Sequence, residues 1–227
     1  MIVEVPDGRF NAYVARPAAA EAPVVVVLQE IFGVNADLRA TCDELAGAGF
    51  IAISPDLFWR HAPGLDLNAW TEADWKQALA LYESYDIDQG VGDIAATIAA
   101  ARTIEGSSGK VGVMGFCLGG LLSFLTATRT SVDAAVAYYG GGTDQHLAEA
   151  DRLSAPLMMH LGEEDEFISK QAQQQIKEAL AGRPDVEIYA YPGCAHAFAR
   201  HTGAHYDAAA ADVANRRTRA FFDRHLR

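Results

Sequence analysis

The sequence predicts a single α/β domain over residues 1–227, with a mostly parallel central sheet and helices on both faces. Short apolar runs rich in β-branched residues recur along the chain, and segments with helical spacing of apolar residues lie between them. This alternation favours right-handed crossovers, and therefore parallel strands. Near the N-terminus, two extended segments flank Pro6-Asp7-Gly8, a turn signal that predicts an antiparallel hairpin at the sheet edge.

Six segments have the composition of strands that are buried on both faces. Several of them end in glycine or in other turn-forming residues, as expected where a strand enters a loop. The segments are 23–29, 50–58, 110–116, 132–140, 155–162 and 186–193. We expect these six to be parallel.

The clearest predicted helix lies between the first two of these strands. Asn35 is placed to cap its N-terminus, and Leu38, Cys42 and Leu45 follow at helical spacing before a terminating glycine. Further helices are expected over 91–102, 118–127, 169–181 and 206–225. Residues 59–88 are the least regular stretch, and we expect them to form a cap or side wall over a site.

Composition limits the partners that this protein can have. Lysine and arginine number 18 against 30 acidic residues, and the net charge of -12 disfavours nucleic acid and anionic membranes. No export signal and no membrane-spanning apolar run is visible, so we expect a cytoplasmic protein. We also expect it to be a monomer that acts on a small molecule. The cysteines Cys42, Cys117 and Cys194 lack the spacing of a disulfide framework or zinc site. We expect no metal and no organic cofactor.

The segment GFCLGG, residues 115–120, places Cys117 between an expected strand and an expected helix. This context and the flanking glycines are typical of a nucleophile elbow, a tight turn that lifts the nucleophile above the end of the sheet. The helix N-terminus favours the thiolate over the thiol. A structural thiol is the alternative, because free cysteine is among the most buried residue types. The glycine pattern favours the nucleophile.

An acid and a histidine follow Cys117 in the chain order that this kind of site requires. Asp165 lies three residues beyond Gly162, and His196 lies three residues beyond Gly193, each just after an expected strand. Three neighbouring acids compete with Asp165 for this role, namely Glu163, Glu164 and Glu166. Among the seven histidines, only His196 occupies the expected loop. The carboxyl ends of parallel strands are where open α/β sheets place their sites.

Acyl transfer on Cys117 also needs two N–H donors for the oxyanion that forms on the substrate. Leu118 directly follows the nucleophile, and Ile31 lies in the loop after the first buried strand. The backbone N–H groups of these two residues are therefore the expected oxyanion hole.

Several motifs along nearly the whole chain resemble the dienelactone hydrolase family of α/β-hydrolases. They are QEIFGVN (29–35), SPDLFWR (54–60), DQGVGDI (88–94), GFCLGG (115–120), AVAYYG (135–140), the loop at 165 and GCAHAFAR (193–200). The resemblance implies an α/β-hydrolase fold, hydrolysis of an ester or lactone, and a triad of Cys117, Asp165 and His196. It further implies that Glu30 takes the thiol proton when substrate arrives, which suits a carboxylate in an apolar pocket.

The resemblance also implies two arginines that hold a substrate carboxylate, for which the planar guanidinium is well suited. Arg200 matches one of them, but the place of the other is taken by Trp75, with Lys76 beside it. Either Lys76 supplies a point charge, or the pocket is more apolar and accepts a different ester. Phe32 and Tyr82 are further candidates for the pocket lining, although large aromatic residues also serve in cores.

Three alternative functions stay open from the sequence. The first is a broad-specificity carboxylesterase without a dedicated lactone substrate. The second is a non-catalytic relative that keeps the fold, because function belongs to sites rather than folds. The third is a thiol redox sensor at Cys117, with Cys194 as its resolving partner.

Overall fold

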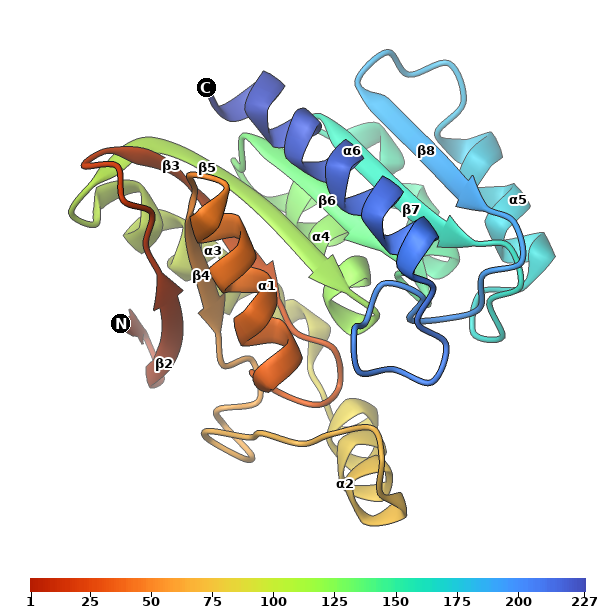
Figure 1. Ribbon diagram of the computed structural model, residues 1–227, viewed down its shortest axis with the longest axis horizontal. Coiled ribbons are helices and arrows are strands. Elements are labelled where there is room, and N and C mark those ends of the chain that lie inside the picture. Colours follow the sequence, from red (N-terminus) through yellow and green to blue (C-terminus); the bar gives the residue numbers. More distant parts are fainter. The chain divides into compact units, whose positions relative to one another are not determined.

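The computed structural model describes residues 1–227, which form two compact units, Met1–Gly112 and Val113–Arg227. Strands and helices alternate along much of the chain (Figure 1). The boundary between the units falls within β5 (Ser107–Phe116). The prediction that residues 1–227 act as a single domain stays a prediction.

The first unit contains strands in the order β1-β2-β4-β3. Its strands are β1 (Ile2–Val5), β2 (Gly8–Ala15), β3 (Ala22–Leu28) and β4 (Ile51–Pro55). β2 pairs antiparallel with both β1 and β4, whereas β3 and β4 are parallel. The predicted N-terminal hairpin is therefore confirmed. Helices α1 (Ala36–Gly47) and α3 (Ile87–Thr103) cover opposite faces of this sheet (Figure 1).

Helix α1 forms as its sequence predicts. The Asn35 side chain accepts a hydrogen bond from the Leu38 N–H at 3.1 Å, which satisfies one of the free donors of the first turn. Leu38, Cys42 and Leu45 are all buried on the face that packs against the sheet. Gly49 has a φ of 90°, a conformation that glycine adopts without strain, and the chain turns there into β4.

Two expectations between β4 and α3 were wrong. The strand predicted over 50–58 ends at Pro55, because the Asp56 carboxylate accepts hydrogen bonds from the Phe58 and Gly64 N–H groups and closes a turn. The stretch predicted as least regular contains a 12-residue helix, α2 (Glu72–Glu83). The Thr71 side chain caps α2 by accepting from the Asp74 N–H, and this Thr-x-x-Asp spacing is a helix-start signal.

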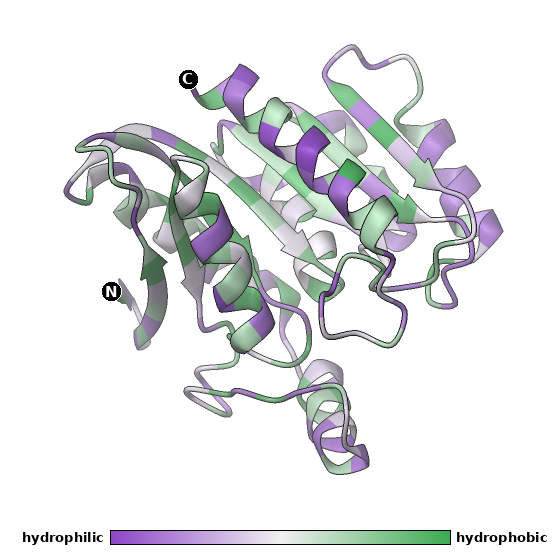
Figure 2. Ribbon diagram, in the orientation of Figure 1, coloured by the Kyte–Doolittle hydropathy of each residue, from purple (hydrophilic) through white to green (hydrophobic).

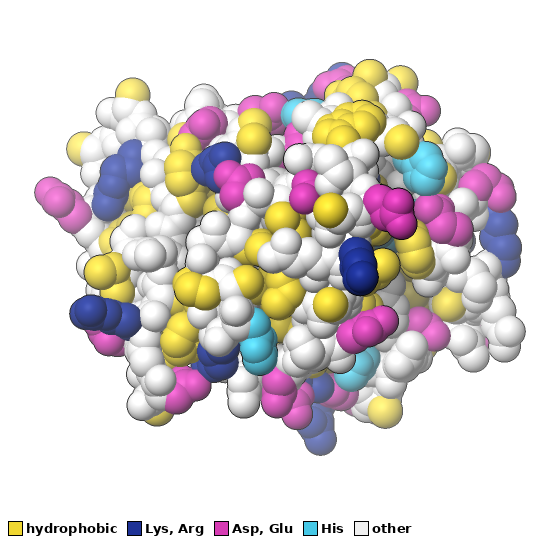
Figure 3. Space-filling model, turned by 90° about the horizontal axis from the view of Figure 1, so that it is seen from below, with side chains coloured by type: hydrophobic (Ala, Val, Ile, Leu, Met, Phe, Trp, Pro, Cys, Tyr) yellow, Lys and Arg dark blue, Asp and Glu magenta, His cyan; other side chains and the backbone are white.

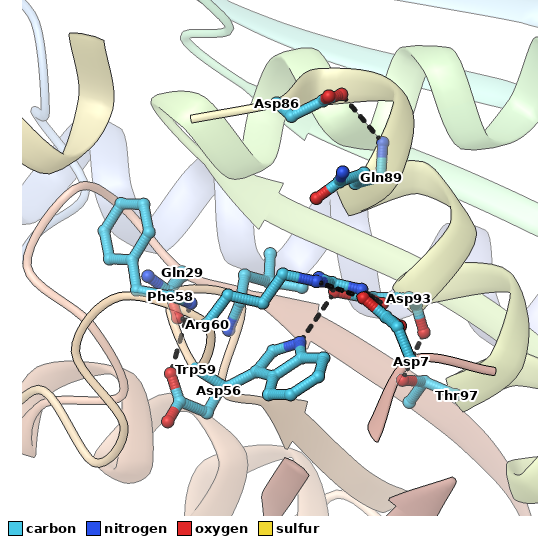
Figure 4. Close-up of polar contacts among 11 residues, drawn as sticks. Asp7, Gln29, Asp56, Phe58, Trp59, Arg60, Asp86, Gln89, Asp93 and Thr97 are labelled. Carbon is cyan, nitrogen blue, oxygen red and sulfur yellow. Dashed lines mark hydrogen bonds and ion pairs between the residues drawn. The ribbon is translucent and has the colours of Figure 1, made fainter. Parts of the chain in front are cut away.

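The residues after β4 are anchored to the rest of the first unit by a paired charge cluster (Figure 4). Arg60 donates to Asp93 of α3 at 2.6 Å and to Asp7 of the β1–β2 turn at 2.8 Å. The Trp59 indole N–H donates to the same buried Asp93 at 2.9 Å. Gln29 accepts from the N–H of Leu57 in the same region. The charged groups of Arg60, Asp7 and Asp93 satisfy one another, so the cluster is structural.

The second unit contains parallel strands in the order β6-β7-β8. Its elements are α4 (Leu118–Arg129), β6 (Ala134–Tyr138), a 3-10 helix (Thr143–Arg152), β7 (Leu157–Gly162), α5 (Lys170–Ala179), β8 (Val186–Tyr191) and α6 (Ala208–Leu226). Helix α6 lies on one face of these strands and α4 on the other (Figure 1). The hydropathy colours show apolar strands between helices with a polar outer surface (Figure 2). The 3-10 helix was not predicted.

A buried polar network joins α6 to the ends of the strands in the second unit. We call it the His160 network, and its members are Tyr138, His160, Tyr191, Asn215, Arg217 and Thr218. The His160 ring is fully buried and bonds Tyr191 Oη at 2.8 Å through Nδ1 and Thr218 Oγ1 at 3.0 Å through Nε2. Burial, together with the charge of Arg217, lowers the pKa of His160 to about 3. His160 is therefore neutral in the folded protein.

We expect His160 to make the folded state less stable as the pH falls. In the unfolded chain its pKa returns to the ordinary value near 6.5, so the unfolded state binds more protons between pH 6.5 and about 3. The free energy of unfolding should fall through this window by about 1.4 kcal/mol per pH unit from this group alone. Urea unfolding of the natural protein and of His160→Gln measures it, and the variant should show the shallower pH dependence. Identical pH dependence in both proteins would contradict this expectation.

None of the helices combines the length and the hydropathy that a membrane-spanning helix needs. On the face shown in Figure 3, acidic and basic side chains are interspersed, without a large field of one sign. The predictions that the protein binds neither nucleic acid nor membrane, and that it is monomeric, stay predictions.

Candidate active site

Cys117 occupies a strained turn between β5 and α4. Its backbone has φ 54° and ψ −114°, values that residues with a side chain rarely adopt. A Cβ at Gly115 would lie 2.3 Å from the Gly119 carbonyl oxygen, so only glycine permits the two sides of the turn to approach this closely. The Cys117 N–H donates to the Tyr138 carbonyl at 3.1 Å, which ties the turn to the end of β6. This geometry is that of a nucleophile elbow.

The structure brings Asp165 and His196 together from loops that follow β7 and β8. His196 Nδ1 lies 2.9 Å from Asp165 Oδ2, while Asp165 Oδ1 accepts from the N–H groups of Phe167 and Ile168. The Asp165 side chain is fully buried, whereas the three glutamates beside it are at least partly exposed. A fixed carboxylate of this kind orients the imidazole so that Nε2 is available for a proton transfer.

His196 also interacts with Cys117. Burial by itself would lower the pKa of His196, but hydrogen bonds with the Asp165 and Cys117 side chains outweigh it and raise this pKa to about 10. The folded site therefore favours a protonated imidazole beside the sulfur. A protonated imidazole at this position can give its proton to a leaving group once the sulfur has attacked.

Several residues at the site were not predicted. The rings of Tyr139 and Phe167 contact the His196 ring edge to face, with centroids 5.1 Å and 4.8 Å away. Gln173 of α5 donates to the Gly162 and Ile168 carbonyls, and so holds both ends of the Asp165 loop. Tyr139 could have been found from the sequence, since it directly follows the strand in AVAYYG, where site residues are expected. Phe167 and Gln173 had none, because their contacts depend on how distant segments meet.

Tyr139 and Ala197 have positive φ values of 37° and 59°, and Cys117 is the only other residue with a side chain that does. Tyr139 and Cys117 both contact the His196 side chain, and Ala197 is the next residue along the chain. Backbone strain concentrates at functional sites, where the surrounding structure must hold it.

Six of the predicted site residues lie in the first unit, namely Glu30, Ile31, Phe32, Trp75, Lys76 and Tyr82. Glu30 and Ile31 directly follow the β3 region and are buried, with exposed fractions of 8% and 6%. The Phe32 and Trp75 rings meet edge to face at 5.0 Å. The Trp75 indole N–H donates to the Ala69 carbonyl at 2.9 Å, so the tryptophan is fixed in this unit.

The remaining substrate candidates differ in exposure. Lys76 and Tyr82 lie on α2 and are exposed to solvent. Arg200 belongs to the second unit, lies four residues beyond His196 and is half-buried. Its backbone N–H donates to the Ala197 carbonyl at 3.0 Å. Leu118 is the first residue of α4, whose first N–H groups have no acceptor within the helix.

An elbow cysteine, a histidine and a buried aspartate lie just beyond strand ends here, which is the arrangement typical of an α/β-hydrolase. The dienelactone hydrolase family model matches residues 10–226, and the chain belongs to this family. A Klebsiella pneumoniae structure assigned to the dienelactone hydrolases superposes with a TM-score of 0.83 at 30% identity, covering 98% of this chain and 97% of that chain. The predicted fold class and the family resemblance are therefore confirmed.

Two relatives are similar over nearly their full length. Carboxymethylenebutenolidase of Pseudomonas putida is 42% identical over 212 residues, which cover 93% of this chain and 90% of the relative. Carboxymethylenebutenolidase 1 of Cupriavidus pinatubonensis is 39% identical over 211 residues, with the same two coverages. The chain is a hydrolase of the ester- and lactone-cleaving class.

Proposed function

We propose that this protein hydrolyses a carboxylic ester or lactone through a thioester on Cys117. The observation that carries the proposal is the hydrogen-bonded series Cys117, His196 and Asp165, in which His196 is held protonated beside the sulfur. An exposed thiol in an unstrained turn would need neither the buried aspartate nor the strained backbone. Residues 1–227 would act as one catalytic domain on a small molecule in the cytoplasm.

The proposed reaction has two displacements. The Cys117 sulfur attacks the carbonyl carbon, a C–S bond forms, and the C–O bond of the ester breaks as His196 gives its proton to the leaving alkoxide. His196 then takes a proton from water, whose oxygen attacks the thioester, and the C–S bond breaks to release the acid and the thiolate. The Leu118 and Ile31 N–H groups would stabilise the oxyanion in both steps. Neither step requires a metal or an organic cofactor.

The role of Glu30 rests on the family resemblance. Its carboxyl group is buried, with 8% of the residue exposed, and a buried carboxylate is a stronger base than one in water. In the proposed reaction Glu30 receives the thiol proton when substrate arrives, which raises the fraction of Cys117 present as the thiolate.

For the substrate, the names of the two relatives favour carboxymethylenebutenolide, a lactone that carries a free carboxylate. In this chain Arg200 would bind that carboxylate, but Trp75 stands where the resemblance implies a second arginine. Because Trp75 is packed on Phe32 and bonded to Ala69, it offers an apolar surface rather than a charge. A neutral ester is therefore the second candidate substrate, and a broad carboxylesterase is the second candidate function.

A comparison of two substrates tests this assignment. We expect the carboxylate-bearing lactone to be hydrolysed with the higher kcat/KM. Arg200→Gln should reduce that value by about 10- to 100-fold, the usual cost of a lost hydrogen bond to a charged group. The same variant should leave hydrolysis of a neutral activated ester within about two-fold, because that ester offers Arg200 no charge.

Other outcomes of the comparison are equally informative. A strong preference for the neutral ester would reject the carboxylate clamp and select the carboxylesterase. Failure of the natural protein to hydrolyse either compound would reject the proposed function.

A further inference from the structure

The hydrogen bonds of the His160 network run in one direction. An arginine can only donate, so Tyr191 Oη accepts from Arg217 at 3.1 Å and its own O–H is left for His160 Nδ1. The proton of the neutral ring then lies on Nε2 and is donated to Thr218 Oγ1. This fixes the tautomer of a histidine that the proposed reaction does not use.

The same logic continues beyond the histidine. Because Thr218 accepts from His160, its O–H is donated to Tyr138 Oη at 2.7 Å. The Tyr138 O–H is in turn donated to Asn215 Oδ1 at 2.9 Å. Each of the linking donors is used once, and the opposite direction would leave the Tyr191 O–H without an acceptor in the network.

The backbone of the same residues holds the loops of the active site. The Tyr138 carbonyl accepts from the Cys117 N–H at 3.1 Å, and the His160 carbonyl accepts from the Tyr139 N–H at 2.8 Å. The Tyr191 carbonyl accepts from Glu163 in the Asp165 loop and from Cys194 in the His196 loop. Tyr138, His160 and Tyr191 thus bond α6 through their side chains. Through their backbone carbonyls, the same residues bond the Cys117 turn, Tyr139, and the loops of Asp165 and His196.

We propose that His160, locked as its neutral Nε2–H tautomer by Thr218 and Tyr191, is a positioning residue for the Cys117–His196 pair. The elbow is strained at Cys117, and strained turns persist only where several contacts determine them. The network supplies these contacts by fixing the ends of β6, β7 and β8 against α6. This inference rests on the proposed function, since it concerns the efficiency of the same site.

Thr218→Val tests the proposal, because valine keeps the shape of threonine and removes only the bridging hydroxyl. We expect kcat for an activated ester to fall about ten-fold with KM changed by less than about two-fold, since geometry of the reacting groups is lost rather than substrate contact. Alkylation of Cys117 by iodoacetamide should slow in parallel. This second readout does not depend on ester hydrolysis, so it separates failure of the inference from failure of the proposed function.

The matched control is Thr126→Val on α4. Thr126 is also buried, but its hydroxyl has no hydrogen-bond partner, so its removal should leave kcat and alkylation unchanged. Should Thr218→Val fail to fold, the Tyr138→Phe variant, which removes the next hydroxyl of the network, takes its place in both assays. A network variant that folds with unchanged kcat and unchanged alkylation would overturn the proposal.

Nitrogen NMR of the histidine rings in the natural protein tests the tautomer directly. We expect a proton on Nε2 and none on Nδ1 of His160 at neutral pH. A proton on Nδ1, or on both nitrogens, would overturn the assigned direction and with it the proposal.

Discussion

Replacing Cys117 with alanine is expected to reduce ester hydrolysis by at least about 1,000-fold, because the variant has no atom that can form the acyl-enzyme. The remaining groups, including the proposed oxyanion donors of Leu118 and Ile31, could still bind substrate and stabilise an oxyanion. KM should therefore change much less than kcat. The measurement is turnover of a chromogenic ester by the purified variant, with unfolding by urea as a check that the fold is intact. A variant with the natural rate would remove the proposed mechanism.

The other two cysteines provide the controls. Burial raises the pKa of Cys42 to about 12, and burial with the nearby charge of Asp207 also raises the pKa of Cys194. Both should therefore remain unreactive thiols at neutral pH. Iodoacetamide should label one cysteine per chain, at Cys117, and activity should be lost in step with labelling. Cys42→Ala should keep full activity.

Iodoacetamide labelling, followed together with ester hydrolysis, also tests whether the protein is a redox sensor. The sensor hypothesis assigns Cys194 as the resolving thiol, but a buried thiol with a raised pKa attacks an oxidised partner poorly. Labelling of Cys117 in a protein that hydrolyses no ester would nevertheless favour the sensor. Labelling together with loss of hydrolysis would reject it.

Much of the fold could be predicted because its signals are local. The cap at Asn35 and the apolar spacing of Leu38, Cys42 and Leu45 lie within one helix, and the structure confirms each of them. Helix α2 was missed although Thr71 carries a capping signal, and although Trp75, Ala78, Leu79 and Tyr82 recur at helical spacing. Its apolar side chains are mostly not in a core, since only Ala78 is buried, but the helix itself could have been predicted from these local signals.

The site divides in the same way between local and distant information. The positions of Cys117, Asp165 and His196 could be predicted because each follows a strand, and the parallel strands place their ends at one edge. Their supporting contacts could not. His160 is an ordinary histidine within a strand until α6 brings Thr218 to it, 58 residues further along the chain.

Gly120→Ala is expected to lower the free energy of unfolding by about 3 kcal/mol, at the upper end of the cost of overpacking. A Cβ at Gly120 would lie 2.3 Å from the Tyr138 carbonyl oxygen and 2.9 Å from the Gly140 backbone. Both contacts are with main-chain atoms, so no side chain can rotate away, and α4 must move from β6. Because the Tyr138 carbonyl also accepts from the Cys117 N–H, this movement should lower kcat as well.

Gly92→Ala is the matched control, since Gly92 also lies inside a helix, α3, but has open space where a Cβ would stand. Helix propensity alone favours alanine over glycine by up to about 1 kcal/mol, so this variant should be slightly more stable than the natural protein. A glycine-to-alanine substitution should therefore change the free energy of unfolding in opposite directions in α4 and α3. Urea unfolding of both variants measures this, and a Gly120→Ala protein as stable as Gly92→Ala would show that α4 is not held against β6 at the distance on which the elbow depends.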